Sequence, residues 1–395
     1  MTGFTATGLV NGETTAVLTG VTASGATGKN YGSYTNTVSG TDSNYNLTFV
    51  PGSLTIGKAN ATVTANSSNV TYTGVAQSVS GFTASGLVNG ETAAVLSGVS
   101  ASGASGTNAG SYTSTASGTD SNYNLTFVNG ALTINKAHLT VTANNASKTY
   151  GDTNPTLSAT VSGFVNNETL LSANVTGAGT ATTAATALTG AGTATITAGA
   201  GTLTASNYDF TNLVNGTLTI GKANATVTAN SNNVTYSGVS QSVSGFTATG
   251  LVNGETTAVL TGVSAGGSGT NFGTYATTAT GTAANYNLSF VNGALSIGKA
   301  NLTRVAATKV YDGLAYTGGN GFTVSGLLGS DTVNSTFYQP NVVYTTGSSN
   351  GAINASSTPY AITPSGATLN TSAGKNYDLS FVSGALTITP APLKV

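Results

Sequence analysis

The chain has 395 residues, of which 5% are charged, with 10 Lys and Arg against 11 Asp and Glu, one His, no Cys and 53 Gly. A net charge of −1 provides no basic patch for nucleic acid or an anionic membrane. The lack of Cys excludes disulfides and thiolate chemistry, and a single His leaves little general acid–base chemistry. No stretch approaches the roughly 18 apolar residues of a membrane span. We therefore expect no enzyme, no catalytic residue, no cofactor, no metal, no nucleic-acid partner and no membrane insertion.

Internal repeats determine the organisation of the chain. The sequence Asn-Tyr-Asn/Asp-Leu/Phe starts at residues 44, 122, 207, 285 and 376, and each copy is followed by Leu-Thr/Ser-Ile. A Lys-Ala pair then follows in the first four copies, at Lys58, Lys136, Lys222 and Lys299. A period of about 80 residues is longer than that of solenoids and propellers and fits a small autonomous domain.

The markers divide the chain into five segments. Both ends interrupt the pattern, so the sequence reads as an excerpt of a longer protein. The predicted segments are a truncated repeat at 1–58 that lacks its first strands, a repeat at 59–136, a divergent repeat at 137–222 with Tyr150-Gly151-Asp152, a repeat at 223–299, and a divergent repeat at 300–395 with Tyr311-Asp312-Gly313.

Within a repeat the pattern indicates strands, taken here in chain order over 59–136. Residues 61–65 and 70–72 alternate between apolar and polar, as half-buried strands do, and 89–96 fits one short helical turn. Residues 111–117 and 122–128 alternate again, and the β-branched Thr and Val in these runs favour a pleated surface. Asn129-Gly130 predicts a two-residue hairpin turn into a last strand at 131–134. The expected order is two strands, the turn, then three or four strands.

These elements predict an all-β fold, a linear tandem array of small domains of about 80 residues. An Ig-like β-sandwich is the first interpretation, and a β-grasp-like sheet with one short helix per domain is the alternative. A continuous β-solenoid is the third, suggested only by the Gly/Ala/Thr-rich segment 177–201. Only residues 135–138 separate the last strand of one repeat from the first of the next, so interdomain tumbling is restricted.

The few residues that carry charge have structural explanations. His138 lies at a position that Asn occupies in other repeats, which indicates a surface residue. Asp120 lies in a Gly-Thr-Asp-Ser-Asn turn, where an Asx-type bond to its own backbone is expected, and no acid cluster fits a Ca²⁺ site. The repeated junction Lys is interpreted as a guard of strand edges. One acidic position recurs in every repeat, which indicates a structural role: Glu13, Glu91, Glu168, Glu255 and Asp331.

The motifs together resemble a known family. Tyr-Gly-Asp at 150–152, Tyr-Asp-Gly at 311–313, Gly-Leu-Val-Asn-Gly-Glu-Thr at 86–92 and Asn-Tyr-Asn-Leu-Thr-Phe at 122–127 are similar to the MBG and YDG repeat domains of large bacterial surface exoproteins related to filamentous haemagglutinin. The resemblance covers essentially the whole chain. It implies export to the bacterial cell surface and a place in an adhesin's stalk, and it carries over no catalytic or ligand residue.

The function predicted from the sequence is therefore that of a spacer in a secreted or cell-surface bacterial adhesin or biofilm-matrix protein. Its expected partners are the neighbouring repeats of the same longer chain, with glycan or surface ligands bound through domains outside this sequence. The alternative is a repeated weak glycan- or protein-binding module that acts by multivalency.

Overall fold

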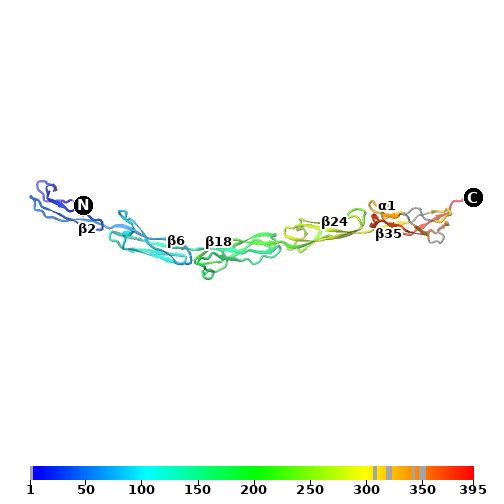
Figure 1. Ribbon diagram of the computed structural model, residues 1–395, viewed down its shortest axis with the longest axis horizontal. Helices are drawn as coiled ribbons and strands as arrows, with labels where there is room; N and C mark the ends of the chain where they lie inside the picture. Colours follow the sequence, from blue (N-terminus) through cyan, green and yellow to red (C-terminus); the bar gives the residue numbers. More distant parts are fainter. Residues whose placement is uncertain (1–2, 306–308, 317–322, 340–342, 347–352) are drawn as a thin grey trace. The chain divides into compact units, whose positions relative to one another are not determined.

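The structure is a computed structural model that describes residues 3–305, 309–316, 323–339, 343–346 and 353–395. Strands dominate these residues, with short 3-10 turns and one α-helix of four residues, α1 (Val333–Thr336) (Figure 1). Contacts divide the chain into two compact units. Unit 1 comprises Met1–Asn144, Leu157–Thr183 and Thr195–Gly216, and unit 2 comprises Asn145–Thr156, Ala184–Ala194 and Thr217–Val395. The division passes through the segment 137–222.

The segment 59–136 in unit 1 shows the complete repeat. Its elements are β5 (Ala59–Ala65), β6 (Ser68–Thr71), β7 (Gln77–Val79), β8 (Phe82–Ser85), the 3-10 turn η2 (Ala93–Val95), β9 (Val99–Gly106), β10 (Gly110–Gly118), β11 (Tyr123–Val128) and β12 (Gly130–Asn135). They form a three-stranded sheet in the order β11-β5-β8 and a five-stranded sheet in the order β6-β12-β10-β9-β7. In each sheet an early strand pairs in parallel with a late one, β5 with β11 and β6 with β12.

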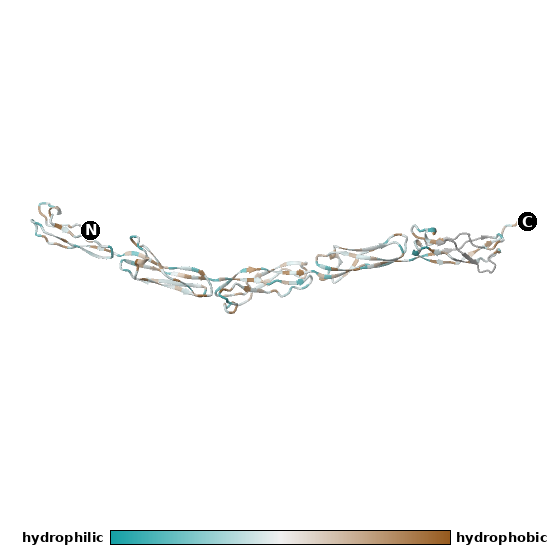
Figure 2. Ribbon diagram, in the orientation of Figure 1, coloured by the Kyte–Doolittle hydropathy of each residue, from teal (hydrophilic) through white to brown (hydrophobic). Residues whose placement is uncertain are grey.

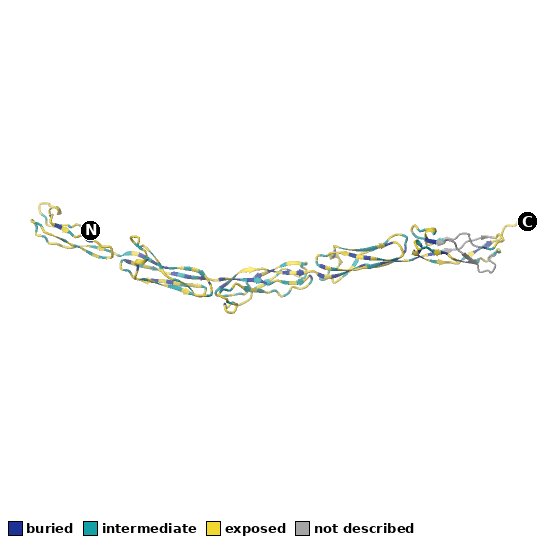
Figure 3. Ribbon diagram, in the orientation of Figure 1, coloured by how far each residue is buried: buried dark blue, intermediate teal, exposed yellow. Residues whose placement is uncertain are grey.

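The two sheets enclose an apolar cluster. On β5 every second residue, Ala61, Val63 and Ala65, is buried, as expected for a strand with one face on a core. These residues cluster with Leu96 and with Ala116 of the other sheet. Hydrophobic and hydrophilic residues are interspersed along the strands (Figure 2), and buried and exposed residues alternate (Figure 3). The predicted all-β, tandem β-sandwich-type architecture is confirmed.

The predicted hairpin at Asn129-Gly130 is wrong. β11 and β12 lie in different sheets, so the chain crosses from one sheet to the other at this point. Neither residue has a positive φ, which a type I′ turn would need. The glycine has another cause, because a Cβ at Gly130 would lie 2.3 Å from the carbonyl oxygen of Ala65 and 2.4 Å from that of Asn66. A close backbone approach, rather than a turn, requires glycine here.

The strand count also differs from the prediction. Four strands, rather than two, precede the short helical element, because β7 and β8 also form. These strands have only three and four residues, and they are joined by Gly81 in the left-handed region at φ 84. Short polar strands carry too few alternations to be recognised in sequence. The helical turn predicted in 89–96 is confirmed as η2.

The segment 223–299 in unit 2 repeats this topology, with sheets in the orders β23-β20-β26 and β21-β27-β25-β24-β22. The same first-to-last parallel pairs recur, between β20 and β26 and between β21 and β27. Its elements are β20 (Ala223–Ala229), β21 (Asn232–Thr235), β22 (Gln241–Ser244), β23 (Phe246–Thr249), η3 (Thr257–Val259), β24 (Val263–Gly269), β25 (Gly273–Gly281), β26 (Tyr286–Val291) and β27 (Gly293–Gly298).

The segment 137–222 contributes to both units. Its strands are β13 (Ala137–Ala143), β14 (Ala146–Thr149), β15 (Ala159–Ser162), β16 (Thr180–Thr182), β17 (Gly192–Gly199), β18 (Tyr208–Val214) and β19 (Gly216–Gly221). In unit 1, β13 pairs with β15 and, in parallel, with β18. In unit 2, β14 pairs in parallel with β19. Within 177–201, β16 pairs antiparallel with the end of β17, so this segment forms sheet strands rather than a solenoid rung.

The segment 300–395 keeps the two parallel pairs, β28 with β35 and β29 with β37. Its other sheets have the orders β31-β34 and β32-β33-β36. Apart from α1, its described elements are β28 (Ala300–Val305), β29 (Lys309–Val310), β30 (Thr323–Ser325), β31 (Phe337–Gln339), β32 (Val343–Thr346), β33 (Tyr360–Ser365), β34 (Thr368–Leu369), η4 (Ala373–Asn376), β35 (Tyr377–Phe381), β36 (Gly384–Leu386) and β37 (Ile388–Thr389).

The segment 1–58 contains η1 (Thr15–Val17), β1 (Val21–Ala23), β2 (Gly32–Asn36), β3 (Val38–Gly40) and β4 (Gly52–Ile56). These strands pair as β1-β3 and β2-β4. Residues 45–50 have the same sequence as β11, Tyr-Asn-Leu-Thr-Phe-Val, yet they form no strand, and Val50 is 79% exposed. In the described residues nothing stands in the place that β5 takes beside β11. Pairing with β5, rather than the local sequence, makes these six residues a strand at 123–128.

Candidate functional site at the junctions between repeats

A carboxylate and two tyrosines meet where the segment 59–136 joins 137–222. Tyr72 Oη donates to Glu168 Oε1 at 2.6 Å, and Tyr208 Oη donates to Glu168 Oε2 at 2.5 Å. The Val165 N–H donates to Tyr208 Oη at 3.1 Å, and the two tyrosine rings meet edge to face with centroids 5.3 Å apart. Hydrogen bonds to a charged acceptor are stronger than neutral ones, and edge-to-face rings attract each other. This arrangement joins one repeat to the next.

Backbone pairing places each of these groups. Tyr72 continues the pairing of β6 with β12, since its N–H donates to the Asn135 carbonyl at 2.8 Å. Glu168 follows a turn in which Asn166 and Asn167 are left-handed, with φ 50 and 56, a conformation that Asn tolerates better than most residues. Tyr208 is the first residue of β18. The triad therefore forms at points that the sheets fix.

The same triad recurs at the next two junctions. Tyr150 Oη donates to Glu255 Oε1 at 2.5 Å, and Tyr286 Oη donates to the other oxygen of Glu255. At the following junction, described by Tyr236, Asp331 and Tyr377, the phenol of Tyr236 donates to Asp331 Oδ2 at 2.8 Å and that of Tyr377 at 2.7 Å. We call the tyrosine from the preceding repeat the donor tyrosine, the acid the junction acid, and the tyrosine on the acid's own repeat the resident tyrosine. The donor tyrosines are Tyr72, Tyr150 and Tyr236; the junction acids are Glu91, Glu168, Glu255 and Asp331; the resident tyrosines are Tyr123, Tyr208, Tyr286 and Tyr377.

The structural role predicted for the recurring acid is thus confirmed, whereas its tyrosine partners were not predicted. Each donor tyrosine lies about 100 residues before its acid, at separations of 96, 105 and 95. The signal was present in the sequence, because a Tyr closely followed by Gly recurs at one position of the repeats. In the sequence this motif stands out only at 150–152 and 311–313, where it marks the divergent repeats and the family resemblance and names no contact partner.

The glycine after each donor tyrosine lies directly against the next repeat. Gly74 has φ 78, and a Cβ there would lie 2.6 Å from the Asn166 Cβ. At Gly151 a Cβ would approach a methyl group of Val252 to 2.5 Å. A side chain at these positions would strain the backbone and press the repeats apart, so the Tyr-and-Gly motif serves the junction as a unit.

An asparagine forms a second contact at each junction. The Asn that opens the Asn-Tyr motif accepts, through Oδ1, a backbone N–H from a loop of the preceding repeat. The four bonds are Tyr31 N to Asn122 at 2.9 Å, Ala109 N to Asn207 at 2.9 Å, Ala191 N to Asn285 at 3.0 Å and Phe272 N to Asn376 at 2.6 Å. The contact thus gives a backbone N–H of one repeat an acceptor on the next.

The junction lysines, interpreted from the sequence as guards of strand edges, have specific partners in the structure. Lys58 Nζ donates to the Asp120 carbonyl at 2.7 Å, and Lys136 and Lys222 make equivalent bonds of 2.8 Å. Lys299 instead pairs with the Asp378 carboxylate at 3.1 Å. Each lysine therefore reaches into the repeat that follows it.

Apolar packing continues across the junctions. Tyr72, Leu132 and Ile134 of one repeat form a single buried cluster with Leu139 and Tyr208 of the next. Only Lys136 separates the end of β12 from the start of β13. A second cluster joins 223–299 to 300–395 in the same way, through residues such as Leu295 and Leu302. The repeats therefore share core residues as well as hydrogen bonds.

The junction tyrosines have raised pKa values. Burial, followed by the hydrogen bond to Glu168, raises the pKa of Tyr208 to about 12. Burial and Glu255 likewise raise the pKa of Tyr286 to about 12, and burial raises the pKa of Tyr72. A neutral phenol can donate to a carboxylate, whereas a phenolate would repel it. The triads hence keep their donors protonated throughout the neutral pH range.

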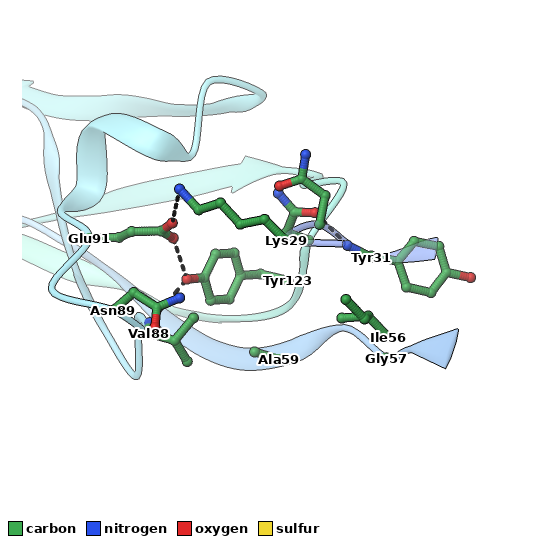
Figure 4. A pocket seen from close by; sticks show the side chains of 11 residues that line it. Lys29, Tyr31, Ile56, Gly57, Ala59, Val88, Asn89, Glu91 and Tyr123 are labelled. Atoms are coloured by element: carbon green, nitrogen blue, oxygen red, sulfur yellow. Dashed lines mark hydrogen bonds and ion pairs between the residues drawn. The ribbon is translucent and has the colours of Figure 1, made fainter. Parts of the chain in front are cut away.

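The junction between 1–58 and 59–136 differs, because the described residues place no donor tyrosine there. Tyr123 donates to Glu91 Oε2 at 2.6 Å, but the Lys29 ammonium lies 3.8 Å from Glu91 Oε1. A cavity of about 260 Å³ opens beside these groups, with Ile56 and Ala59 on its wall (Figure 4).

The remaining candidates have local partners. His138 Nδ1 lies 2.7 Å from Asp209 Oδ1 in an exposed pair. Asp120 Oδ1 accepts from the Asn122 N–H at 2.7 Å, so the predicted Asx-type turn is confirmed. In the part of the chain that the structure describes, no group of three or more His, Cys, Asp or Glu is placed to hold a metal. No described helix has the length and apolar character needed to cross a membrane.

The family follows from a comparison with family models. The model of the MBG domain (YGX type) matches residues 2–55, 61–133, 139–219 and 225–296. The chain belongs to the MBG domain family. Its matched segments are tandem MBG domains, and the junction triads described above link consecutive members of this array or link the last of them to 300–395.

Comparisons with individual proteins add little. No curated protein matches the chain. The solved structure titled "Sidekick-1 immunoglobulin domains 1-5" has a TM-score of 0.23 and 12% identity, covering 91% of this chain and 86% of that chain. The protocadherin GammaB4 extracellular domain has a TM-score of 0.17 and 9% identity, covering 95% of this chain and 72% of that chain. At these TM-scores neither structure supports a statement about the MBG domains.

Proposed function

We propose that this array of MBG domains is a structural spacer, a stalk segment of a secreted or cell-surface bacterial adhesin or biofilm-matrix protein that holds a binding tip away from the cell. One observation supports it above the others: the repeated motifs are used to join repeats. The donor tyrosine, the junction acid, the Asn and the Lys each contact a neighbouring repeat. A chain whose recurring polar residues join its own repeats suits a structural role.

The same observation argues against catalysis. Among the described residues the recurring acid is bonded to one or two tyrosines, as Glu168 is to Tyr72 and Tyr208, and this use of the acid is structural, so we propose no enzymatic activity. The partners we propose are the neighbouring repeats of the same longer chain, with glycans or surface proteins bound through other domains, outside the cell on the bacterial surface.

A glycan array probed with the 395-residue chain tests the proposal against its alternative. A spacer gives no reproducible binding. Binding to several related glycans, strengthened when the chain is displayed in many copies, would instead support a weak module that acts by multivalency.

Small-angle scattering provides a second test. Four domains of about 80 residues, each roughly 30 Å across, and the shorter segment 1–58 must extend end to end if they act as a spacer. The expected maximum dimension is then well above about 100 Å. A particle of about 50 Å would contradict the spacer role.

A further inference from the structure

We propose that the repeats 59–136 and 223–299 resist tension along the chain through a ladder of parallel backbone pairs between their first and last residues. This deepens the proposed spacer role and rests on it, because a stalk whose tip is bound to a surface is pulled from its two ends. In 59–136 the ladder joins β5 to β11 and β6 to β12. We call these residues, 59–71 and 123–135, and their equivalents in 223–299, the terminal ladder.

One register runs through the whole terminal ladder of 59–136. Tyr123 pairs with Ala59 at its start and Asn135 pairs with Thr71 at its end, and both pairs are separated by 64 residues. In 223–299 the corresponding separation is 63 residues at both ends. The first and last segments of a repeat therefore cross together from one sheet to the other and stay in step.

A side chain bridges the ladder where the two segments change sheets. At the same place in three repeats, a backbone N–H of the last segment donates to a short polar side chain of the first. The bonds are Ala131 N to Ser67 Oγ at 3.1 Å, Thr217 N to Asn145 Oδ1 at 2.7 Å and Ala294 N to Ser231 Oγ at 3.0 Å. Hydrogen bonding therefore continues between the two halves of the ladder.

The parallel direction decides how tension acts on these bonds. Because both segments run the same way, the chain enters at Ala59, at one end of the ladder, and leaves at Asn135, at the other end. Tension along the chain therefore slides the two segments past each other, and the evenly spaced bonds of a parallel pair resist it together. Antiparallel terminal strands would bring entry and exit to the same end, where tension would break their bonds one after another.

Each terminal segment is also held inside one sheet. β5 pairs with β8 on its other edge, and β12 pairs with β10 on its other edge. The first segment thus includes a central strand of the three-stranded sheet, and the last segment includes a central strand of the five-stranded sheet. Neither segment can be pulled out of the repeat without breaking bonds on both edges of that strand.

Single-molecule force spectroscopy can compare two directions of pulling on the same folded protein. The chain has no Cys, so two introduced Cys attach the handles at defined sites in the 395-residue protein. In Asn60→Cys with Asn135→Cys, the handles lie at opposite ends of the terminal ladder, and pulling slides the segments. In Asn60→Cys with Asn124→Cys, they lie on directly paired residues at one end, and pulling separates the segments pair by pair. All three asparagines are exposed.

At one pulling speed, we expect the opposite-end pair to unfold at a force at least about twofold higher than the same-end pair, because many bonds must break together and forced unfolding follows the unfolding rate. Circular dichroism should show the same thermal midpoint for both variants, so that only the direction of pulling differs. Asn224→Cys with Gly298→Cys or with Asn287→Cys repeats the comparison in 223–299, at positions that are also exposed.

Equal forces in the two directions, or a higher force for the same-end pair, would overturn the proposal. This outcome is distinct from failure of the spacer role. Glycan binding by the chain would contradict the spacer role and leave the force difference in place, whereas equal forces would leave the spacer role to the glycan and scattering tests.

Discussion

Removing one hydroxyl tests whether the triads hold the junctions. The Tyr72→Phe substitution keeps a ring that is 4% exposed and packed 5.3 Å from the Tyr208 ring. It deletes the hydroxyl that donates the 2.6 Å bond to Glu168. A hydrogen bond to a charged group contributes about 1.5–3 kcal/mol, and the unpaired acceptor adds to its loss. We therefore expect opening of this junction to become easier by about 1.5–3 kcal/mol.

Hydrogen exchange with mass spectrometry can measure that change locally. Since about 1.4 kcal/mol corresponds to tenfold in an equilibrium, amides in 132–139 should exchange roughly 10 to 150 times faster in Tyr72→Phe. Tyr311→Phe is the matched control. Tyr311 follows β29 as Tyr72 follows β6, but it is 37% exposed, so its substitution should change little. Equal effects of the two substitutions on their own surroundings would refute the role assigned to the donor tyrosines.

Three further outcomes follow from the same contacts. The pKa of Tyr208 lies above that of an unfolded tyrosine, so the stability that its protonated phenol contributes is complete below about pH 10 and is lost as the pH rises toward about 12. Circular dichroism should show alkaline unfolding in that interval, and unchanged stability there would contradict this prediction. Gly130→Ala should destabilise the protein by about 1–3 kcal/mol in denaturant titrations. Gly52→Ala should be nearly neutral, because the nearest atom to its new Cβ is the Asn36 Cβ at 3.6 Å. Residues 45–50 should exchange amide hydrogens faster than the identical sequence at 123–128, and equal protection would show that pairing does not decide strand formation.

Much of the fold could be predicted because the repeat markers keep a fixed order and the strands alternate strictly. Alternation identified the strands at 61–65 and 122–128, since each has one face on the core. The partner of a strand is not encoded locally. β11 pairs with β5, which lies 64 residues earlier, and the Asn129-Gly130 signal favoured a hairpin with β12 instead.

The junction site was predictable only in part, for a related reason. Recurrence of the acid at Glu168 and Glu255 indicates that the position matters to the repeat and favours a structural role. Recurrence alone does not show which residue the acid contacts. The donor tyrosine belongs to the preceding repeat, so its partner becomes visible only when two repeats are placed together.

The shared clusters finally distinguish independent domains from coupled ones. Leu132→Ala and Val63→Ala each truncate a side chain that is fully buried. The leucine truncation costs on the order of 2–5 kcal/mol, and the valine truncation, which removes fewer atoms, costs less. Leu132 lies in the cluster that includes Leu139 of the next repeat, whereas the cluster of Val63 lies wholly within 59–136. We expect Leu132→Ala to speed hydrogen exchange in β13 and β18 as well as in its own repeat, and Val63→Ala to act on 59–136 alone. If both substitutions leave 137–222 unchanged, the repeats unfold independently and the packing across the junction contributes no stability.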